Sequence, residues 1–136
     1  MGDIYHNVVL WDLATEKKRS QLRRNDRQMI SVAFSPEGQS VATVSTNRHE
    51  LEIDLWDVAS GTAKRKFEIR DGRLLSFDRH LHDAPALAFS ADGKLLAFGG
   101  CEFARRARLW EVSTGKEIRQ FGSDRASIAS LGFSPR

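Results

Sequence analysis

Short apolar runs alternate with turn-forming residues along the whole of this 136-residue chain. The runs are rich in Val, Ile, Leu and Phe, and turn residues separate them at intervals of roughly 8 to 12 positions. A helical repeat would place its apolar residues at three- and four-residue spacings over a longer window, which this pattern excludes. The pattern therefore predicts an all-β fold built from short strands.

Two signatures recur in alternation among these runs. The first is a run that ends in tryptophan and an acid, at Trp11-Asp12, Trp56-Asp57 and Trp110-Glu111. The second is a run that ends in Phe-Ser, at Phe34, Phe89 and Phe133. Phe133 follows Phe89 by 44 positions, which matches the roughly 40 to 45 residues of a four-stranded propeller blade. Two interleaved signals at one repeat length predict a repeat protein.

Four strands fit within each repeat, and their polarity changes in order. The first strand is nearly all apolar, as in a strand buried on both faces, and is predicted at 29–34, 84–89 and 128–133. The second is predicted at 40–44 and 94–98, and the third, which carries the tryptophan, at 51–58 and 107–112. The fourth is charged and is predicted at 17–22, 63–69 and 116–121. This gradient predicts a radial blade whose fourth strand faces water.

These motifs resemble the WD40 repeat family of β-propellers over essentially the whole chain. The resemblance rests on the Ser-Pro-Glu-Gly turn at 35–38, the Ser-Ala-Asp-Gly turn at 90–93 and the three Trp-acid endings. It implies an incomplete propeller: strands three and four of a first blade (1–24), a full blade (25–70), an inserted loop (71–83), a second full blade (84–122) and the first strand of a further blade (123–136). It also implies a platform for other macromolecules without intrinsic activity.

A WD40 blade often contains a hydrogen-bonded set of His, Ser or Thr, Asp and the strand-three Trp. The resemblance offers Thr43 and Glu50 for this set in the first full blade, whereas Phe98 and Ala104 take the equivalent places in the second. The histidine position is occupied by Asn25, His80 and Asp124, so only His80 matches. We assign structural roles to Trp11, Asp12, Phe34, Trp56, Asp57, His80, Phe89, Trp110, Glu111 and Phe133.

Composition and charge narrow the classes of function. With 40% hydrophobic and 29% charged residues, the chain has the composition of a soluble globular protein. The formal net charge is +3, and basic residues crowd into 17–24 and 105–108. Such patches attract nucleic acid, but a solvated outer strand is the simpler explanation and nucleic acid is not the expected partner, because no ladder of aromatic side chains accompanies the charges. Cys101 is the only cysteine, so we expect the cytoplasm or another reducing compartment.

Catalytic and metal-binding motifs are weak in this sequence. His80 and His82 are two residues apart but lack further clustered ligands, and Cys101 has no evident base partner. There is no nucleophile elbow and no phosphate-binding loop. We therefore expect no enzymatic activity, no catalytic residue, no metal and no cofactor. An alternative that stays open is the regulatory or substrate-docking part of a larger enzyme such as a kinase.

The extra length of the chain falls in connections that share one end of the blades. Trp56 to Phe89 spans 33 positions, against 23 from Trp110 to Phe133, and the connections between second and third strands are also long. Insertions confined to one face mark the binding face of a repeat protein, although a passive loop is the alternative. The residues that we expect to contact a protein partner are Arg73, Phe77, Arg79, His82, Phe103 and Arg105.

The predicted strands number one fewer than three whole blades, and closed propellers typically have about four to eight blades. The apolar first and last faces of the array should then be exposed. We expect the remaining blades to come from the same longer chain or from another copy, and we expect no membrane contact. Nucleic acid binding through strand 17–24 is a further alternative, with protein as the leading partner class.

Overall fold

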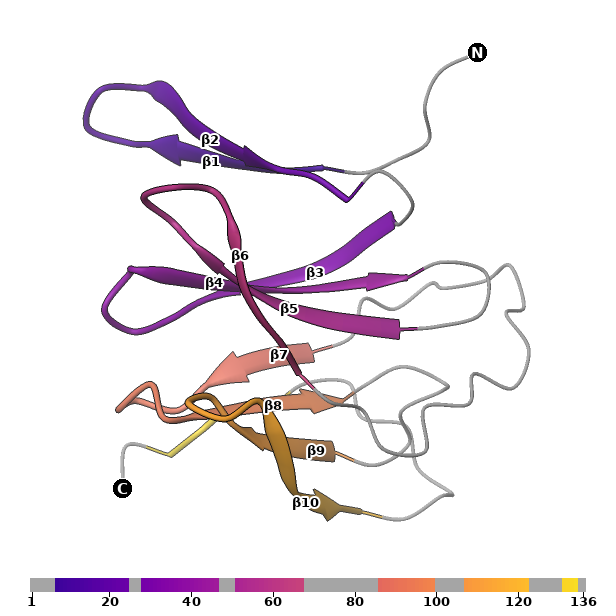
Figure 1. Ribbon diagram of the computed structural model, residues 1–136. Helices are drawn as coiled ribbons and strands as arrows, with labels where there is room; N and C mark the ends of the chain where they lie inside the picture. Colours follow the sequence, from indigo (N-terminus) through magenta and orange to yellow (C-terminus); the bar gives the residue numbers. More distant parts are fainter. Residues whose placement is uncertain are drawn as a thin grey trace.

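A computed structural model describes residues 7–24, 28–46, 51–67, 86–99, 107–122 and 131–134, and every regular element within them is a β-strand (Figure 1). In these ranges there is no helix of the length and apolarity that a membrane crossing requires. The strands are β1 (Val8–Asp12), β2 (Lys17–Leu22), β3 (Gln28–Phe34), β4 (Ser40–Thr46), β5 (Leu51–Asp57), β6 (Ala63–Phe67), β7 (Ala86–Phe89), β8 (Leu95–Gly99), β9 (Ala107–Glu111) and β10 (Lys116–Phe121).

The strands form three antiparallel sheets that are stacked on one another (Figure 1). The first sheet is the pair β1-β2, the second has the order β3-β4-β5-β6, and the third has the order β7-β8-β9-β10. Each sheet is a meander in chain order, and strands β3 and β7 of neighbouring sheets contact each other. The predicted all-β fold with four-stranded, propeller-like blades in an unclosed array is confirmed.

Two apolar cores hold the three sheets together, because alternate residues of a strand face opposite neighbours. Between the first and second sheets, Leu10 and Leu22 pack with Trp56 and Val41. Between the second and third sheets the core comprises Ala42, Val44, Ile53, Leu55, Phe67, Leu96, Phe98 and Trp110. Strand β5 therefore contributes Ile53 and Leu55 to one core and Trp56 to the other.

The tryptophan of each four-stranded sheet packs against the preceding sheet. Trp56 and Trp110 are buried in the two cores, at 5% and 0% exposure, whereas Trp11 is 60% exposed. No described strand precedes the first sheet, and no sheet of the described residues packs on Trp11. The apolar face at that end of the array is exposed as the sequence predicts, with Val9 and Leu13 beside Trp11.

The prediction that the first strand of each repeat is buried on both faces is wrong for β3. Val32 is 46% and Phe34 55% exposed. Their partners across the sheet are Thr43 and Val41, so both side chains are on the face that looks toward the first sheet. Among the described residues, that sheet contains only the two outer strands of a blade, and none of its strands lies opposite this part of β3. The most completely buried strand is instead β4.

The chain-terminal strand expected at 128–133 is not seen in the part of it that the structure describes. Residues 131–134 carry no strand assignment, and half-buried Phe133 lies among them. A strand is defined by its ladder of hydrogen bonds to a neighbour, and none of the described strands pairs with these residues.

Candidate interaction surfaces

The partner site expected from the sequence falls outside the residues that the structure describes. This holds for Arg73, Phe77, Arg79, His82, Phe103 and Arg105, and also for His80, Cys101, Asn25, Glu50, Ala104 and Asp124. The strands that flank the two longest connections are described. Strand β6 ends at Phe67 and β7 begins at Ala86, while β8 ends at Gly99 and β9 begins at Ala107. Because the strands are antiparallel, all four of these ends lie at the same end of the sheets, opposite the short turns (Figure 1).

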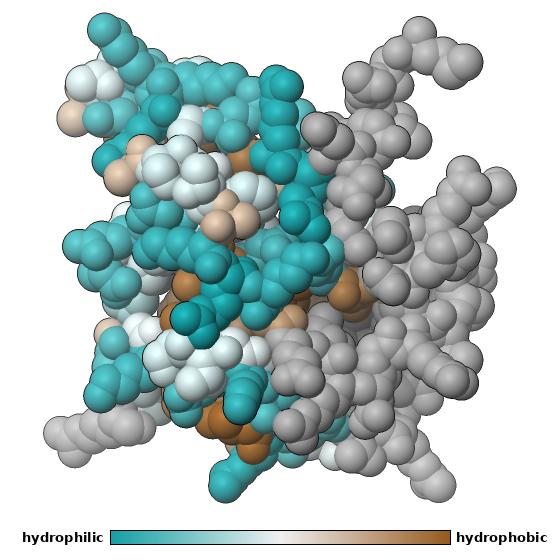
Figure 2. Space-filling model, in the orientation of Figure 1, coloured by the Kyte–Doolittle hydropathy of each residue, from teal (hydrophilic) through white to brown (hydrophobic). Residues whose placement is uncertain are grey.

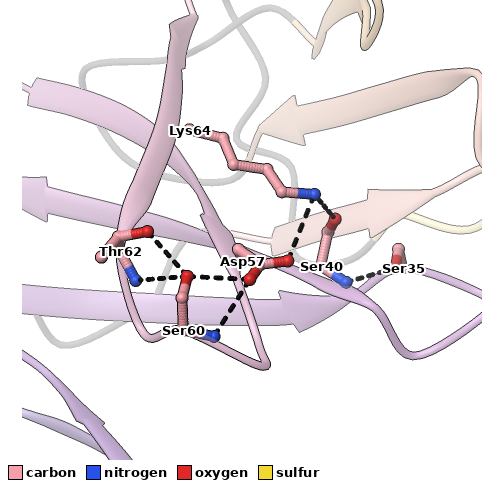
Figure 3. Close-up of polar contacts among 6 residues, drawn as sticks. All are labelled: Ser35, Ser40, Asp57, Ser60, Thr62 and Lys64. Carbon is pink, nitrogen blue, oxygen red and sulfur yellow. Dashed lines mark hydrogen bonds and ion pairs between the residues drawn. The ribbon is translucent and has the colours of Figure 1, made fainter.

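The acid that follows each tryptophan orders the turn between the third and fourth strands. Asp57 accepts hydrogen bonds from the backbone N–H of Ser60 at 3.0 Å and from its hydroxyl at 2.8 Å (Figure 3). These bonds lower the pKa of Asp57, with a further contribution from Lys64, which approaches the carboxylate at 3.5 Å. Asp12 accepts from the N–H of Ala14 at 2.9 Å in the first sheet. The conspicuous acids of the repeat are therefore turn caps.

A second set of contacts closes the turns between the first and second strands. The Ser35 hydroxyl oxygen accepts the N–H of Ser40 at 3.0 Å (Figure 3). The Ser90 hydroxyl oxygen accepts the N–H of Leu95 at the same distance. Asp92 accepts a 2.6 Å hydrogen bond from the Ser90 hydroxyl, which lowers the pKa of Asp92. The polar side chains at this end bind their own backbone, and their arrangement suits rigidity more than recognition.

The turn glycines occupy equivalent positions in successive sheets. Gly61 and Gly115, each five residues after its tryptophan, have φ of +68° and +72°. In the first sheet Glu16 takes this position with φ of +58°, a conformation that L-residues seldom adopt. The N-terminal turn therefore has the same backbone conformation at this position as the two glycine-containing turns.

One hydrogen bond of the WD40-type polar set is present. In the second sheet the Trp56 Nε1–H donates to the Thr43 hydroxyl at 2.8 Å, and both residues are buried. In the third sheet Phe98 takes the place of Thr43, and its ring lies 6.2 Å from Trp110, centroid to centroid. The hydroxyl that Trp56 contacts in the second sheet is therefore replaced by an aromatic ring beside Trp110 in the third.

We predict that Thr43→Val lowers the free energy of unfolding by about 1 to 3 kcal/mol, because it leaves the buried Trp56 N–H without this acceptor at almost unchanged side-chain volume. Urea denaturation measures the effect. Thr43→Ser is the matched control: it keeps the hydroxyl and removes one methyl group, at a cost of about 1 kcal/mol. Equal stability of the valine variant and the parent protein would contradict a structural role for this hydrogen bond.

An ionic cluster between the first and second sheets was missed by sequence reasoning. Arg24, directly after β2, pairs with Glu52 at 2.9 Å, and its Nε is 3.8 Å from Asp54 Oδ2. Lys66 of β6 also pairs with Glu52. The Asp54 side chain is only 1% exposed. The signal was available in the sequence, since Glu52, Asp54 and Trp56 alternate along one strand and must share a face.

The third sheet has its own buried ion pair. Arg108, which the sequence placed in a basic patch, pairs with Glu117 at 3.0 Å, with side-chain exposures of 13% and 4%. Arg108 is thus engaged inside the fold. In the described part of the chain, no group of three or more His, Cys, Asp or Glu side chains is placed to hold a metal ion.

Comparisons with known proteins agree with these repeats. No protein-family profile matches the chain. It is 29% identical over 126 residues to the U3 snoRNP-associated protein-like YAO of Arabidopsis thaliana, covering 84% of this chain and 23% of that protein. It is 28% identical over 129 residues to the cilia- and flagella-associated protein 52 of Chlamydomonas reinhardtii, covering 95% and 18%. It is 24% identical over 126 residues to periodic tryptophan protein 2 of Arabidopsis thaliana, covering 85% and 13%. The similarity is compatible with the WD40 repeat family, and the chain spans less than a quarter of each of these three relatives.

Proposed function

We propose that this chain is part of a non-catalytic scaffold of the WD40 type that binds other proteins through the end of its sheets from which the long connections leave. The observation that carries the proposal is the asymmetry between the two ends. At one end the strands are joined by short turns whose polar groups bond to each other, such as Asp57 with Ser60. At the other end, the connection between β6 and β7 is 18 residues long and the connection between β8 and β9 is seven residues long.

The relatives support an assembly role. One relative is named as a U3 snoRNP-associated protein, another as a periodic tryptophan protein and the third as a cilia- and flagella-associated protein. None of these names describes a catalytic activity. A scaffold is also the function that requires least chemistry from the described residues, because Asp57 and Asp92 are engaged in turns and Glu52 and Glu117 in ion pairs.

The proposal is tested by combined alanine substitution of Arg73, Phe77, Arg79, His82, Phe103 and Arg105, followed by quantitative affinity capture. Partners bound by the parent chain should be lost from this variant, while its circular dichroism spectrum stays unchanged. The control is Glu37→Ala/Lys94→Ala, which alters exposed residues of the short turns at the opposite end. Loss of the same partners from the control, or from neither variant, would refute the assignment of the binding end.

We also propose that further blades, from the same longer chain or from another copy, cover the exposed apolar residues. Trp11 and Leu13 on the outer face of the first sheet, with Val32 and Phe34 on β3, form apolar surface of a kind that soluble monomers seldom expose. Size-exclusion chromatography with light scattering tests this proposal: the 136-residue chain should self-associate as its concentration rises. A compact monomer at every concentration would contradict it.

A further inference from the structure

The outermost strand of every sheet carries exposed cations. Across the three outer strands there are eight, and they are Lys17, Lys18 and Arg19 of β2, Lys64, Arg65 and Lys66 of β6, and Lys116 and Arg119 of β10. The only acid within these strands is Glu117, which is 4% exposed and paired with Arg108. We call these eight residues the outer rim. It concentrates far more positive charge than the formal net charge of +3 implies for the whole chain.

A β-bulge recurs in the outer strand of each sheet and affects the direction of its side chains. Beside each tryptophan the pairing of the third and fourth strands shifts register, between Leu10 and Trp11, Leu55 and Trp56, and Glu117 and Arg119. The extra residue on the outer strand is Arg19, Lys64 or Ile118. A β-bulge redirects the side chain of the residue that it contains. Two of the three equivalent bulges therefore hold cations of the outer rim.

The rim continues from sheet to sheet because the β5–β6 turn and the β9–β10 turn each lie against the outer strand of the preceding sheet. A Cβ added to Gly61, in the turn before β6, would lie 3.5 Å from the Ser20 Cβ of β2. A Cβ added to Gly115, in the turn before β10, would lie 3.2 Å from the Arg65 side chain and 2.8 Å from the Lys66 carbonyl oxygen. Figure 2 shows mainly hydrophilic residues on the side where β6 crosses in front of its sheet.

Most of these charges are available to a ligand. Lys64 and Lys66 form ion pairs, with Asp57 and Glu52. The remaining six cations form none within the described part of the chain, although the Arg119 guanidinium lies 5.7 Å from the centre of the Phe121 ring. Unpaired surface cations side by side repel one another, so a polyanion that neutralises several of them at once would bind favourably.

We propose that the outer rim binds the phosphate backbone of a nucleic acid duplex without reading its sequence. Phosphate contacts need only cations, whereas single strands are bound through aromatic side chains that stack on bases. Stable protein interfaces centre on buried aromatic or Arg anchors, and stable membrane binding needs an apolar anchor in addition to a basic patch. Of the three outer strands, β2 and β6 expose no large apolar side chain, since Leu22 and Phe67 are buried, and only β10 exposes such side chains, Ile118 and Phe121. This surface is separate from the loop end, so either proposal can fail without the other.

Fluorescence anisotropy with a 20-base-pair DNA duplex, and with an RNA duplex of the same sequence, tests the proposal. At physiological salt the expected Kd for the DNA duplex is roughly 1 to 100 µM, as for sequence-independent binding. The logarithm of the binding constant should fall linearly with the logarithm of the salt concentration. The triple variant Arg19→Gln/Arg65→Gln/Lys116→Gln, with one change on each outer strand, should make that slope shallower by about 2 to 3 units on DNA. If the triple variant reduces the salt slope less on the RNA duplex than on the DNA duplex, DNA is the preferred duplex.

The matched control is Lys94→Gln, which removes an exposed cation from the β7–β8 turn, outside the eight residues of the rim. It should leave the salt slope unchanged. The proposal is overturned if the triple variant binds the duplex like the parent, or if Lys94→Gln changes the slope as much per charge removed. Tighter binding to poly-glutamate or to phosphatidylserine vesicles than to either duplex would assign the rim to an acidic protein or a membrane, and would equally overturn it. Circular dichroism checks that all variants are folded.

Discussion

Replacing Trp110 by alanine is expected to lower the free energy of unfolding by about 3 to 5 kcal/mol, the range for large aromatic side chains deleted from a core. Trp110 is completely buried, at 0% exposure. Its ring centroid is 6.2 Å from those of Phe67 and Phe98, so it joins the second sheet to the third. Urea denaturation followed by far-ultraviolet circular dichroism measures the loss.

The chain provides its own control for this experiment. Trp11 occupies the same position in the first sheet but is 60% exposed, because no described residue packs on that face. Trp11→Ala should therefore change stability by less than about 0.5 kcal/mol, as for ordinary surface substitutions. Comparable losses at Trp11 and Trp110 would show that the environment of a tryptophan does not follow its place in the stack, and would contradict the arrangement of sheets described above.

This contrast shows how far the sequence could predict the fold. Periodic spacing located the strands closely, and the outer strands β2 and β10 have their predicted bounds. Spacing is a local property of the chain, so the positions of the strands can be predicted from the sequence of every copy of the repeat. Burial instead depends on what packs opposite. Trp11, Trp56 and Trp110 have the same sequence signature and very different exposures, and Phe34 is exposed in a strand that reads as buried.

The candidate sites divide in a similar way. The turn-forming role of Asp57 follows from a local motif, and Thr43 was identified from the family pattern. The cluster of Arg24 with Glu52 and Asp54 was not identified, because it joins segments 28 or more positions apart and the spacing of strands does not pair them. The partner residues expected on the long connections, such as Arg73 and Phe103, stay predictions, since they lie outside the described residues.

Substituting Gly115 by alanine is the second change with a large expected effect, about 2 to 5 kcal/mol of unfolding free energy. Two costs add at this position. The φ of +72° disfavours an L-residue by about 1 to 2 kcal/mol. The new Cβ would also lie 2.8 Å from the Lys66 backbone oxygen, and moving packed backbone apart costs a further 1 to 3 kcal/mol or so. The β9–β10 turn must therefore retreat from β6, and the contact between the second and third sheets loosens.

Gly38→Ala separates these two costs, because Gly38 has nearly the same φ, +74°, and open space around its Cβ position. Its expected loss is only the conformational cost of about 1 to 2 kcal/mol, partly offset by a less flexible unfolded chain. Urea denaturation of both variants should therefore place Gly115→Ala below Gly38→Ala by at least about 1 kcal/mol. Equal losses would mean that the β9–β10 turn is not in contact with the neighbouring outer strand. The continuity of the outer rim depends on that contact, so the stability measurement and the duplex-binding measurement examine the same packing of sheets by independent means.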